Sequence, residues 1–176
     1  MASFTERMIG AAKLDVHTYE EVEADPTAMG QAMGVVVLSA VAAGIGMVGR
    51  QGAGLIATTI MALVGWFVWA LLTYLIGAKL MPEPQTKADL GQLLRTIGFS
   101  AAPGVFRIFA IIPILGLLIS VGASIWMLVA MVIAVRQALD YTSTGRAVGV
   151  VIIGFLAYLL VGVFFAALGA MGRALG

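Results

Sequence analysis

The sequence has no cysteine, a single histidine and few charged residues. Hydrophobic residues make up 61% of its 176 positions and charged residues 11%, whereas soluble domains have roughly 45–50% apolar and about 25% charged residues. The missing cysteines exclude disulfides, thiolate nucleophiles and cysteine-ligated metals. A net charge of +1 offers no basic surface for nucleic acid. These deficits exclude an ordinary soluble domain.

The sequence contains four long runs without any charged residue. They cover residues 26–49, 51–78, 108–135 and 147–172. Each exceeds the roughly 20 residues that a helix needs to cross a bilayer. Alternating segments of about 10 residues, which a membrane β-barrel requires, are absent. The sequence therefore predicts an all-α, polytopic membrane protein.

The N-terminal region has the pattern of short amphipathic helices. Glu6 and Arg7 lie where a cleavable signal peptide would need an apolar run, so we expect the first span to act as the insertion signal. Residues 3–14 favour a short interfacial helix or a frayed tail. Thr18 and Glu21 have capping-box spacing, which predicts the start of a second helix. We expect residues 1–26 to form a cytoplasmic amphipathic segment and residues 27–173 a five-span membrane domain.

The first two spans are predicted over residues 28–49 and 55–81, joined by a short turn. Gly30 and Gly34 are spaced for close helix contact, either within the chain or in a dimer. Trp66, Trp69 and Tyr74 lie too far inside the second span to serve only as an interfacial belt. We expect these three aromatic side chains to pack against neighbouring helices.

After the second span, the sequence predicts an interfacial helix and then two further crossings. Thr86 is a candidate cap for an interfacial helix, on which Arg95 would face water or headgroups. Residues 96–135 then provide enough chain for two crossings of about 20 residues each. Pro113 and Gly116 favour a break between these crossings, and Pro103 favours a kink in the first of them.

The distribution of Lys and Arg predicts the orientation. With five spans and the N-terminus inside, Arg50 and Arg173 are outside. The cytoplasmic side then carries Arg7, Lys13, Lys79, Lys87, Arg95, Arg136 and Arg146. A single crossing in place of two would move Arg136 and Arg146 outside, which agrees less well with the positive-inside rule. We therefore expect five spans with the C-terminus outside and all nine acidic residues cytoplasmic.

Three motifs, taken in order, resemble the Yip-domain family of Ypt/Rab-interacting membrane proteins in its prokaryotic branch. Asp25 and the residues after it are similar to the family's motif before the first span, without its Gly-Pro pair. Gly98, Phe99 and Pro103 resemble its Gly-Tyr…Pro motif, and Val135-Arg136-Gln137-Ala138-Leu139 resembles the pattern in bacterial members. The resemblance implies five spans with a cytoplasmic N-terminus. It also implies relatives that bind Rab-type GTPases and each other in eukaryotic vesicle traffic, a role that does not transfer simply to a prokaryote.

Arg107 is the main candidate for a functional residue inside the membrane. A charge within a span is costly and is by default a functional-site hypothesis. The segment that holds Arg107 has no acidic residue to pair with it. Arg107 therefore either binds a ligand, lipid or ion, or extends its long side chain to a headgroup as an anchor.

Two polar groups outside the spans are further candidates. Arg136 and Asp140 are four residues apart and can pair on a helix surface. His17 with Glu20 and Glu21 is a weak metal site, and oxygen ligands would equally suit Mg²⁺ or Ca²⁺. A solvated helix face explains the same pattern. The sequence predicts no cofactor.

The motifs argue against an enzyme. Gly98-Phe99-Ser100-Ala101 is faintly similar to the Gly-x-Ser-Gly of intramembrane serine proteases, but the only histidine precedes the first span. We therefore expect a non-catalytic scaffold or partner-binding module in the cell membrane. Its expected partners are lipids, further copies of itself, and a cytoplasmic or membrane protein. The alternative is a small transporter or channel with a broken third helix around Pro103, Arg107 and Pro113.

Overall fold

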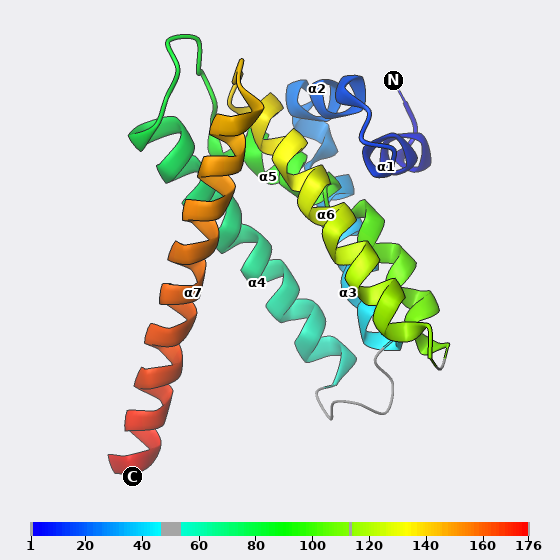
Figure 1. Ribbon diagram of the computed structural model, residues 1–176, viewed down its shortest axis with the longest axis vertical. Coiled ribbons are helices and arrows are strands. Elements are labelled where there is room, and N and C mark those ends of the chain that lie inside the picture. Colours follow the sequence, from blue (N-terminus) through cyan, green and yellow to red (C-terminus); the bar gives the residue numbers. More distant parts are fainter. Residues whose placement is uncertain (1, 47–53, 113, 176) are drawn as a thin grey trace.

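The computed structural model describes residues 2–46, 54–112 and 114–175, the last four of them by their backbone alone (Figure 1). Every regular element in this part of the chain is helical. The elements are α1 (Phe4–Ala12), α2 (Val16–Ala24), η1 (Pro26–Ala28), α3 (Met29–Gly46), α4 (Leu55–Thr73), η2 (Tyr74–Leu80), α5 (Leu90–Phe99), η3 (Ala102–Ile111), α6 (Gly116–Ala138) and α7 (Thr144–Leu175). Five stretches are long and apolar enough to cross a membrane: Pro26–Gly46, Leu55–Leu80, Leu90–Ile111, Gly116–Ala138 and Thr144–Met171. The predicted all-α class with five membrane spans is confirmed.

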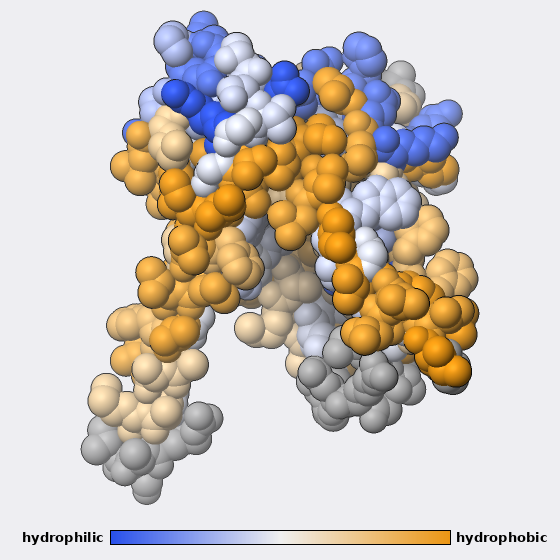
Figure 2. Space-filling model, in the orientation of Figure 1, coloured by the Kyte–Doolittle hydropathy of each residue, from blue (hydrophilic) through white to orange (hydrophobic). Residues whose placement is uncertain are grey.

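Polar residues gather at one end of the molecule (Figure 2). Helices α1 and α2 lie at the same end as the loops that join η2 to α5 and α6 to α7 (Figure 1). We call residues 2–28, 81–89 and 139–143 the polar cap. All nine acidic residues of the chain lie in it. The other described surface is largely apolar, as expected for helices surrounded by lipid.

The third span lies in the centre of the bundle. Its first half, α5, packs against α2, α3, α4 and α6, and its second half, the 3₁₀ helix η3, packs against α3 and α6. Leu93, Thr96 and Phe99 are completely buried. The prediction of an interfacial helix before this span is therefore wrong. The amphipathic pattern arises because one side of α5 faces the polar cap and the other side faces apolar helices.

Small residues allow the third span to approach α3 closely. A Cβ atom added at Gly98 would lie 2.8 Å from the Cβ atom of Ala32, and one at Gly104 would overlap the hydroxyl of Ser39. At Gly34 the Cβ position is 3.7 Å from the ring of Phe4 in α1, which is an ordinary van der Waals distance and not a close helix contact. Gly30 makes no such contact with the described residues.

The helix caps differ from those predicted. Asp15, not Thr18, caps α2, and its carboxylate accepts a hydrogen bond from the His17 N–H at 3.2 Å. Asp89, not Thr86, caps α5 and forms a capping box with Gln92. A carboxylate adds a favourable interaction with the helix dipole to the hydrogen bond, which explains why the acid takes the cap position.

A sharp reversal separates the third and fourth spans. Helix η3 ends at Ile111, Ile112 is extended, Ile114 has a φ of 73°, and α6 begins at Gly116. The predicted pair of crossings in this region is confirmed. Pro113, which we expected at the break, lies outside the described residues.

Helices α4 and α7 diverge with distance from the polar cap (Figure 1). Near the cap, Trp66 and Trp69 of α4 pack inward as predicted. The Trp66 indole N–H donates to the Leu94 carbonyl at 3.0 Å. The Trp69 and Tyr158 rings pack edge-on, with 5.8 Å between their centroids. Farther along α7, large side chains such as Leu160 and Phe165 are exposed. This part of α7 is available to lipid.

Candidate functional site

A buried arginine holds the N-terminal helices together. Arg7 is 2% exposed, and its Nη2 atom lies 2.8 Å from both Glu21 Oε1 and Asp25 Oδ2. Its Nη1 atom also donates to Gln31 Oε1 of α3 at 3.1 Å. The bond from Arg7 lowers the pKa of Glu21, and bonds from Thr27 and Arg7 lower the pKa of Asp25. Arg7 thus ties α1 to α2, to η1 and to the first span.

A second buried arginine, Arg95, donates hydrogen bonds to the C-terminal end of α2. The Arg95 Nε atom donates to the Val22 carbonyl at 2.9 Å, and its Nη2 atom donates to the Glu23 carbonyl. These carbonyls belong to the last turn of α2, where no intrahelical donor remains. A cation is also favoured at a helix C-terminus by the dipole. The prediction that Arg95 faces water is wrong, because α2 covers this part of α5.

Glu23 is a carboxylate of the polar cap whose pKa is raised and not lowered. Burial, and next the negative charge of Asp140, raise its pKa to about 7. Gln92 donates to Glu23 Oε1 at 3.2 Å. The charge state of Glu23 therefore changes near neutral pH at the contact between α2 and α5.

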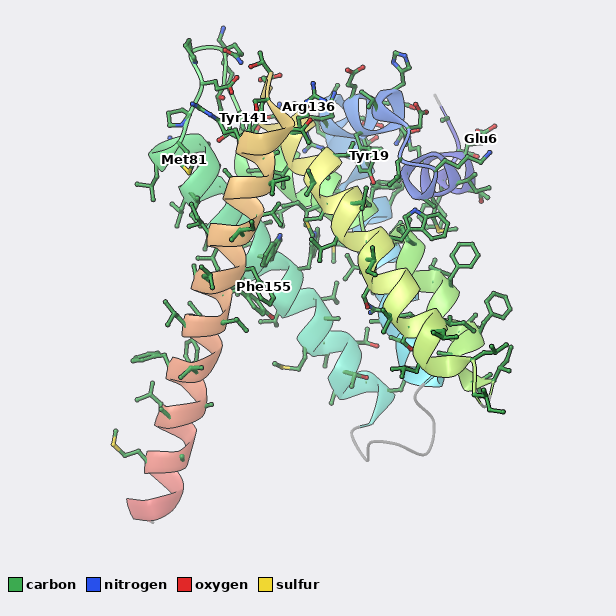
Figure 3. All side chains as sticks on the ribbon, viewed as in Figure 1. Glu6, Tyr19, Met81, Arg136, Tyr141 and Phe155 are labelled. Carbon is green, nitrogen blue, oxygen red and sulfur yellow. The ribbon has the colours of Figure 1, made fainter. Side chains whose placement is uncertain are left out.

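The two loops of the polar cap are tied together by hydrogen bonds. The Tyr141 hydroxyl lies 2.9 Å from the Gly77 carbonyl and 2.7 Å from the Met81 carbonyl. Figure 3 labels Tyr141 and Met81 at the polar-cap end of the molecule. Thr142 donates to Glu83 Oε2 through both its N–H and its hydroxyl at 3.0 Å. The bond from the Thr142 N–H is the largest cause that lowers the pKa of Glu83. These bonds make the loops part of one folded surface.

The predicted pair of Arg136 and Asp140 does not form. Arg136 donates instead to the carbonyls of Tyr141 and Thr142, at 3.2 and 3.4 Å. Asp140 has a φ of 52°, just after the end of α6. The chain has left the helix there, so the i,i+4 geometry that the pair requires is lost.

His17, Glu20 and Glu21 of α2 do not converge on one site. His17 is 92% exposed, and its Nδ1 atom lies 3.4 Å from Glu20 Oε2. The neighbouring Glu21 carboxylate is used by Arg7. Within the described residues, no group of three or more His, Asp or Glu side chains could hold a metal ion.

Arg107 lies on η3, in the part of the third span that is far from the polar cap. Its Nη2 atom donates to Ser124 Oγ of α6 at 2.8 Å, and that hydroxyl donates in turn to the Ser120 carbonyl. The guanidinium is thus turned toward α6. It has no ion pair with any of the nine acidic residues, all of which lie in the polar cap.

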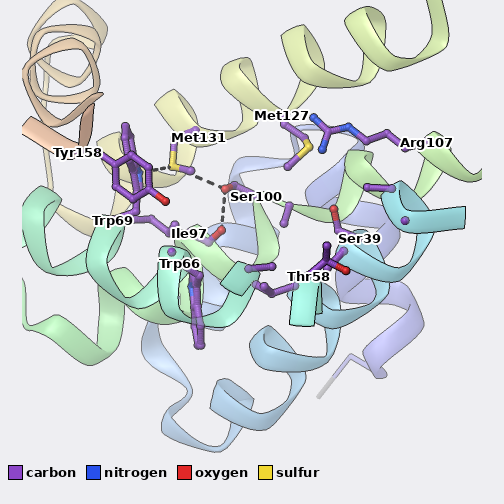
Figure 4. Close-up of a pocket in the computed structure, with 17 residues that line it drawn as sticks. Ser39, Thr58, Trp66, Trp69, Ile97, Ser100, Arg107, Met127, Met131 and Tyr158 are labelled. Carbon is purple, nitrogen blue, oxygen red and sulfur yellow. Dashed lines mark hydrogen bonds between the residues drawn. The ribbon is translucent and has the colours of Figure 1, made fainter. Parts of the chain in front are cut away.

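Arg107 borders two cavities within the bundle. The first has a volume of about 430 Å³ between α3, α4, α5 and α6 (Figure 4). The second, of about 460 Å³, lies between α4, α6 and α7. Trp69, Arg107, Met127 and Met131 line both. No acidic residue lines either cavity.

The remaining predicted residues have packing roles in the structure. Gly98 packs closely against Ala32 of α3. Phe99 is fully buried in the core beside Ala28 and Ala32. Pro103 lies at the first turn of η3, where its missing N–H leaves no bond unmade. The third span therefore changes from α to 3₁₀ winding but stays helical through Ile111.

Sequence reasoning missed the buried arginines and one tryptophan. The indole N–H of Trp126 on α6 donates to the Ala12 carbonyl at the end of α1, at 2.7 Å. Its position in a lipid-spanning run gave no sign of this contact. For Arg7, the excess of acids over residues 20–25 was a usable signal, since buried charges need partners.

Comparison with known families gives a match over most of the chain. The family model described as the Yip1 domain matches residues 17–165. This segment begins in α2 and reaches into the last span. No curated protein and no solved structure shows a significant match to the chain.

Proposed function

Because the chain belongs to the Yip1 domain family of membrane proteins, we propose that it is a non-catalytic membrane module whose polar cap binds a protein partner. The observation that carries this proposal is the construction of the cap. Arg7, Arg95 and Trp126 fasten it to the spans by side-chain bonds. A surface that is ordered before binding loses less entropy when a partner binds.

The exposed part of the cap indicates what kind of partner it suits. Asp15, His17 and Glu20 are exposed on α2. No arginine or lysine is ion-paired to these residues among the described side chains. Charge complementarity mainly sets specificity and association rate. We therefore propose a partner whose binding surface carries Lys and Arg.

We also propose that the cap faces the cytoplasm and that the protein resides in the cell membrane. The support is the positive-inside rule, because Arg7, Lys13, Lys79, Lys87, Arg95, Arg136 and Arg146 all lie at the cap end of the five spans. Self-association through exposed helix surface remains part of the proposal. The transporter alternative has no support in the cavities, which lack acidic residues.

Photo-crosslinking in native membranes tests the proposed partner site. A photoreactive residue replaces His17 in one variant and Leu160, which is 70% exposed on α7, in the control. We expect a discrete protein adduct from position 17, reduced when Glu20→Lys reverses the nearby charge, and no such adduct from position 160. Equal adducts from both positions, or an adduct insensitive to Glu20→Lys, would contradict the proposal.

A further inference from the structure

Arg107 is a charge that the protein itself does not neutralise. All nine acidic residues lie in the polar cap, while Arg107 lies on η3, only four residues before this helix ends away from the cap. One bond to the Ser124 hydroxyl is its side-chain hydrogen bond to the described residues. A guanidinium has five N–H donors. Within a membrane span, its remaining donors and its charge require an external anion or water.

The second cavity beside Arg107 is open to the surrounding bilayer. Leu128, Ile152, Phe155 and Leu156 line this cavity, and each is more than half exposed. On a spanning helix, exposed apolar side chains contact lipid chains. The cavity is therefore a groove between α6 and α7 that an acyl chain can enter sideways. Its volume lies in the range of about 300–1,000 Å³ that is typical of small-molecule sites.

The position of the guanidinium selects the leaflet. Its partner Ser124 is eight residues into α6, which begins at Gly116 away from the cap. At 1.5 Å per residue, this is about 12 Å along a helix of about 34 Å. The charge is thus nearer to the membrane face opposite the cap. Thr58, in the first turn of α4 at that same end, lines the first cavity with Arg107.

We propose that this groove binds one anionic phospholipid from the leaflet opposite the polar cap. Its phosphate pairs with the Arg107 guanidinium, and one acyl chain lies along Met127, Met131 and Phe155 between α6 and α7. Each half of the lipid then has complementary surroundings. The phosphate meets a guanidinium that has no acidic partner, and the acyl chain meets a groove that is almost entirely apolar. Arginine suits the phosphate because its planar fork forms two parallel bonds to oxygens. The site is independent of the proposed protein partner at the other end.

The test compares two lipids that have the same acyl chains but a zwitterionic or an anionic headgroup. Purified protein is reconstituted in nanodiscs of phosphatidylcholine, with and without phosphatidylglycerol of the same acyl chains. We expect retained phosphatidylglycerol by native mass spectrometry, with about tenfold tighter binding than phosphatidylcholine. Such a preference raises the unfolding midpoint by about 3–5 °C in a chain of this size.

Three variants assign the preference to Arg107. Arg107→Gln is expected to abolish it and Arg107→Lys to keep part of it. Lys87→Gln removes one exposed positive charge from the polar cap and is expected to leave it unchanged. In pure phosphatidylcholine, Arg107→Gln should unfold at or above the wild-type temperature, because it removes an unpaired charge. That result separates loss of lipid binding from loss of folding.

Two outcomes would overturn the proposal. One is equal stabilisation of the wild type by both lipids, which would mean that the groove accepts any acyl chain. The other is a preference for phosphatidylglycerol that persists in Arg107→Gln, which would place anionic lipid at the basic residues of the cap. If Arg107→Gln fails to fold, Arg107→Lys replaces it: a reduced preference for phosphatidylglycerol supports the site at Arg107, and an undiminished preference places the anionic lipid at the cap.

Discussion

Three arginines of this chain have three different kinds of hydrogen-bond partner. Arg7 is held by two carboxylates, Arg95 by the carbonyls at the end of α2, and Arg107 by the hydroxyl of Ser124. Each solution depends on a residue from another helix. A helical pattern in the sequence places a charge on one side of its own helix, but it does not show what a neighbouring helix brings to that side. For this reason the burial of Arg95 could not be predicted, and the only sign of a buried Arg7 was the group of acids over residues 20–25.

Glu23 provides a pH-dependent test at the residue scale. Its pKa is raised from 4.5 to about 7 in the folded protein, mainly by burial. In the unfolded chain, the carboxyl group ionises at the lower pH, so between these values the folded state binds more protons. Raising the pH from about 4.5 to about 7 therefore lowers the free energy of unfolding, and above that range the effect is constant.

We expect Glu23→Gln to remove this dependence, since the amide keeps an acceptor for Gln92 but cannot ionise. Thermal unfolding in detergent, measured over this pH range, should give a steeper decline for the wild type than for the variant. Glu6→Gln is the matched comparison: the pKa of Glu6 is lowered, first by its bond from Ser3, so its effect belongs to more acidic pH. Parallel pH curves for wild type and Glu23→Gln would contradict the assignment.

At the scale of elements, the contact between the third span and α3 determines how the bundle closes. Gly98 faces Ala32 so closely that an added Cβ atom would lie 2.8 Å from its Cβ and 3.2 Å from its Cα. Backbone atoms cannot rotate away as a side chain can. We expect Gly98→Ala to lower the free energy of unfolding by about 1–3 kcal/mol, the usual range for overpacking.

Gly122→Ala is the control for this prediction. Gly122 lies in α6, and a Cβ atom there would meet nothing within 4 Å. Because alanine favours a helix over glycine, this variant should be as stable as the wild type or slightly more stable. Both are measured by thermal unfolding in the same detergent. Equal stability of the two variants would show that the third span and α3 can separate without loss.

The elements differed in how far their sequences revealed them. The spans were predictable because residues 26–49 and 147–172 are apolar beyond what any soluble helix needs. The break between the third and fourth spans was predictable from Pro113 and Gly116. The place of α5 was not, since a helix with one polar side looks the same whether that side meets water or a covering helix such as α2.

At the scale of the whole molecule, the two ends differ in kind. The polar cap holds every acidic residue. It also contains the two N-terminal helices, which are bonded to the spans, and two loops that are hydrogen-bonded to each other. The opposite end presents Arg107, the groove between α6 and α7, and the exposed part of α7. The gathering of charge at one end could be read from the sequence once five spans were counted. The groove could not, because it depends on how far α7 diverges from α6.

The orientation of these two ends in the membrane is the last prediction. The absence of cysteine makes single-cysteine labelling clean. His17→Cys reports on the polar cap, and Gly54→Cys reports on the opposite end, where an added Cβ atom meets nothing within 4 Å. Both positions are exposed, so differences in labelling reflect the side of the membrane and not burial.

With the cap in the cytoplasm, as the Lys and Arg distribution predicts, a membrane-impermeant maleimide added to intact cells should label Gly54→Cys and leave His17→Cys unreacted. Permeabilised cells should label both, which verifies that each thiol is reactive. Labelling of His17→Cys in intact cells would reverse the orientation. It would then place the acidic partner surface outside and the Arg107 groove in the cytoplasmic leaflet, where anionic lipids still satisfy the guanidinium but no cytoplasmic protein can reach the cap.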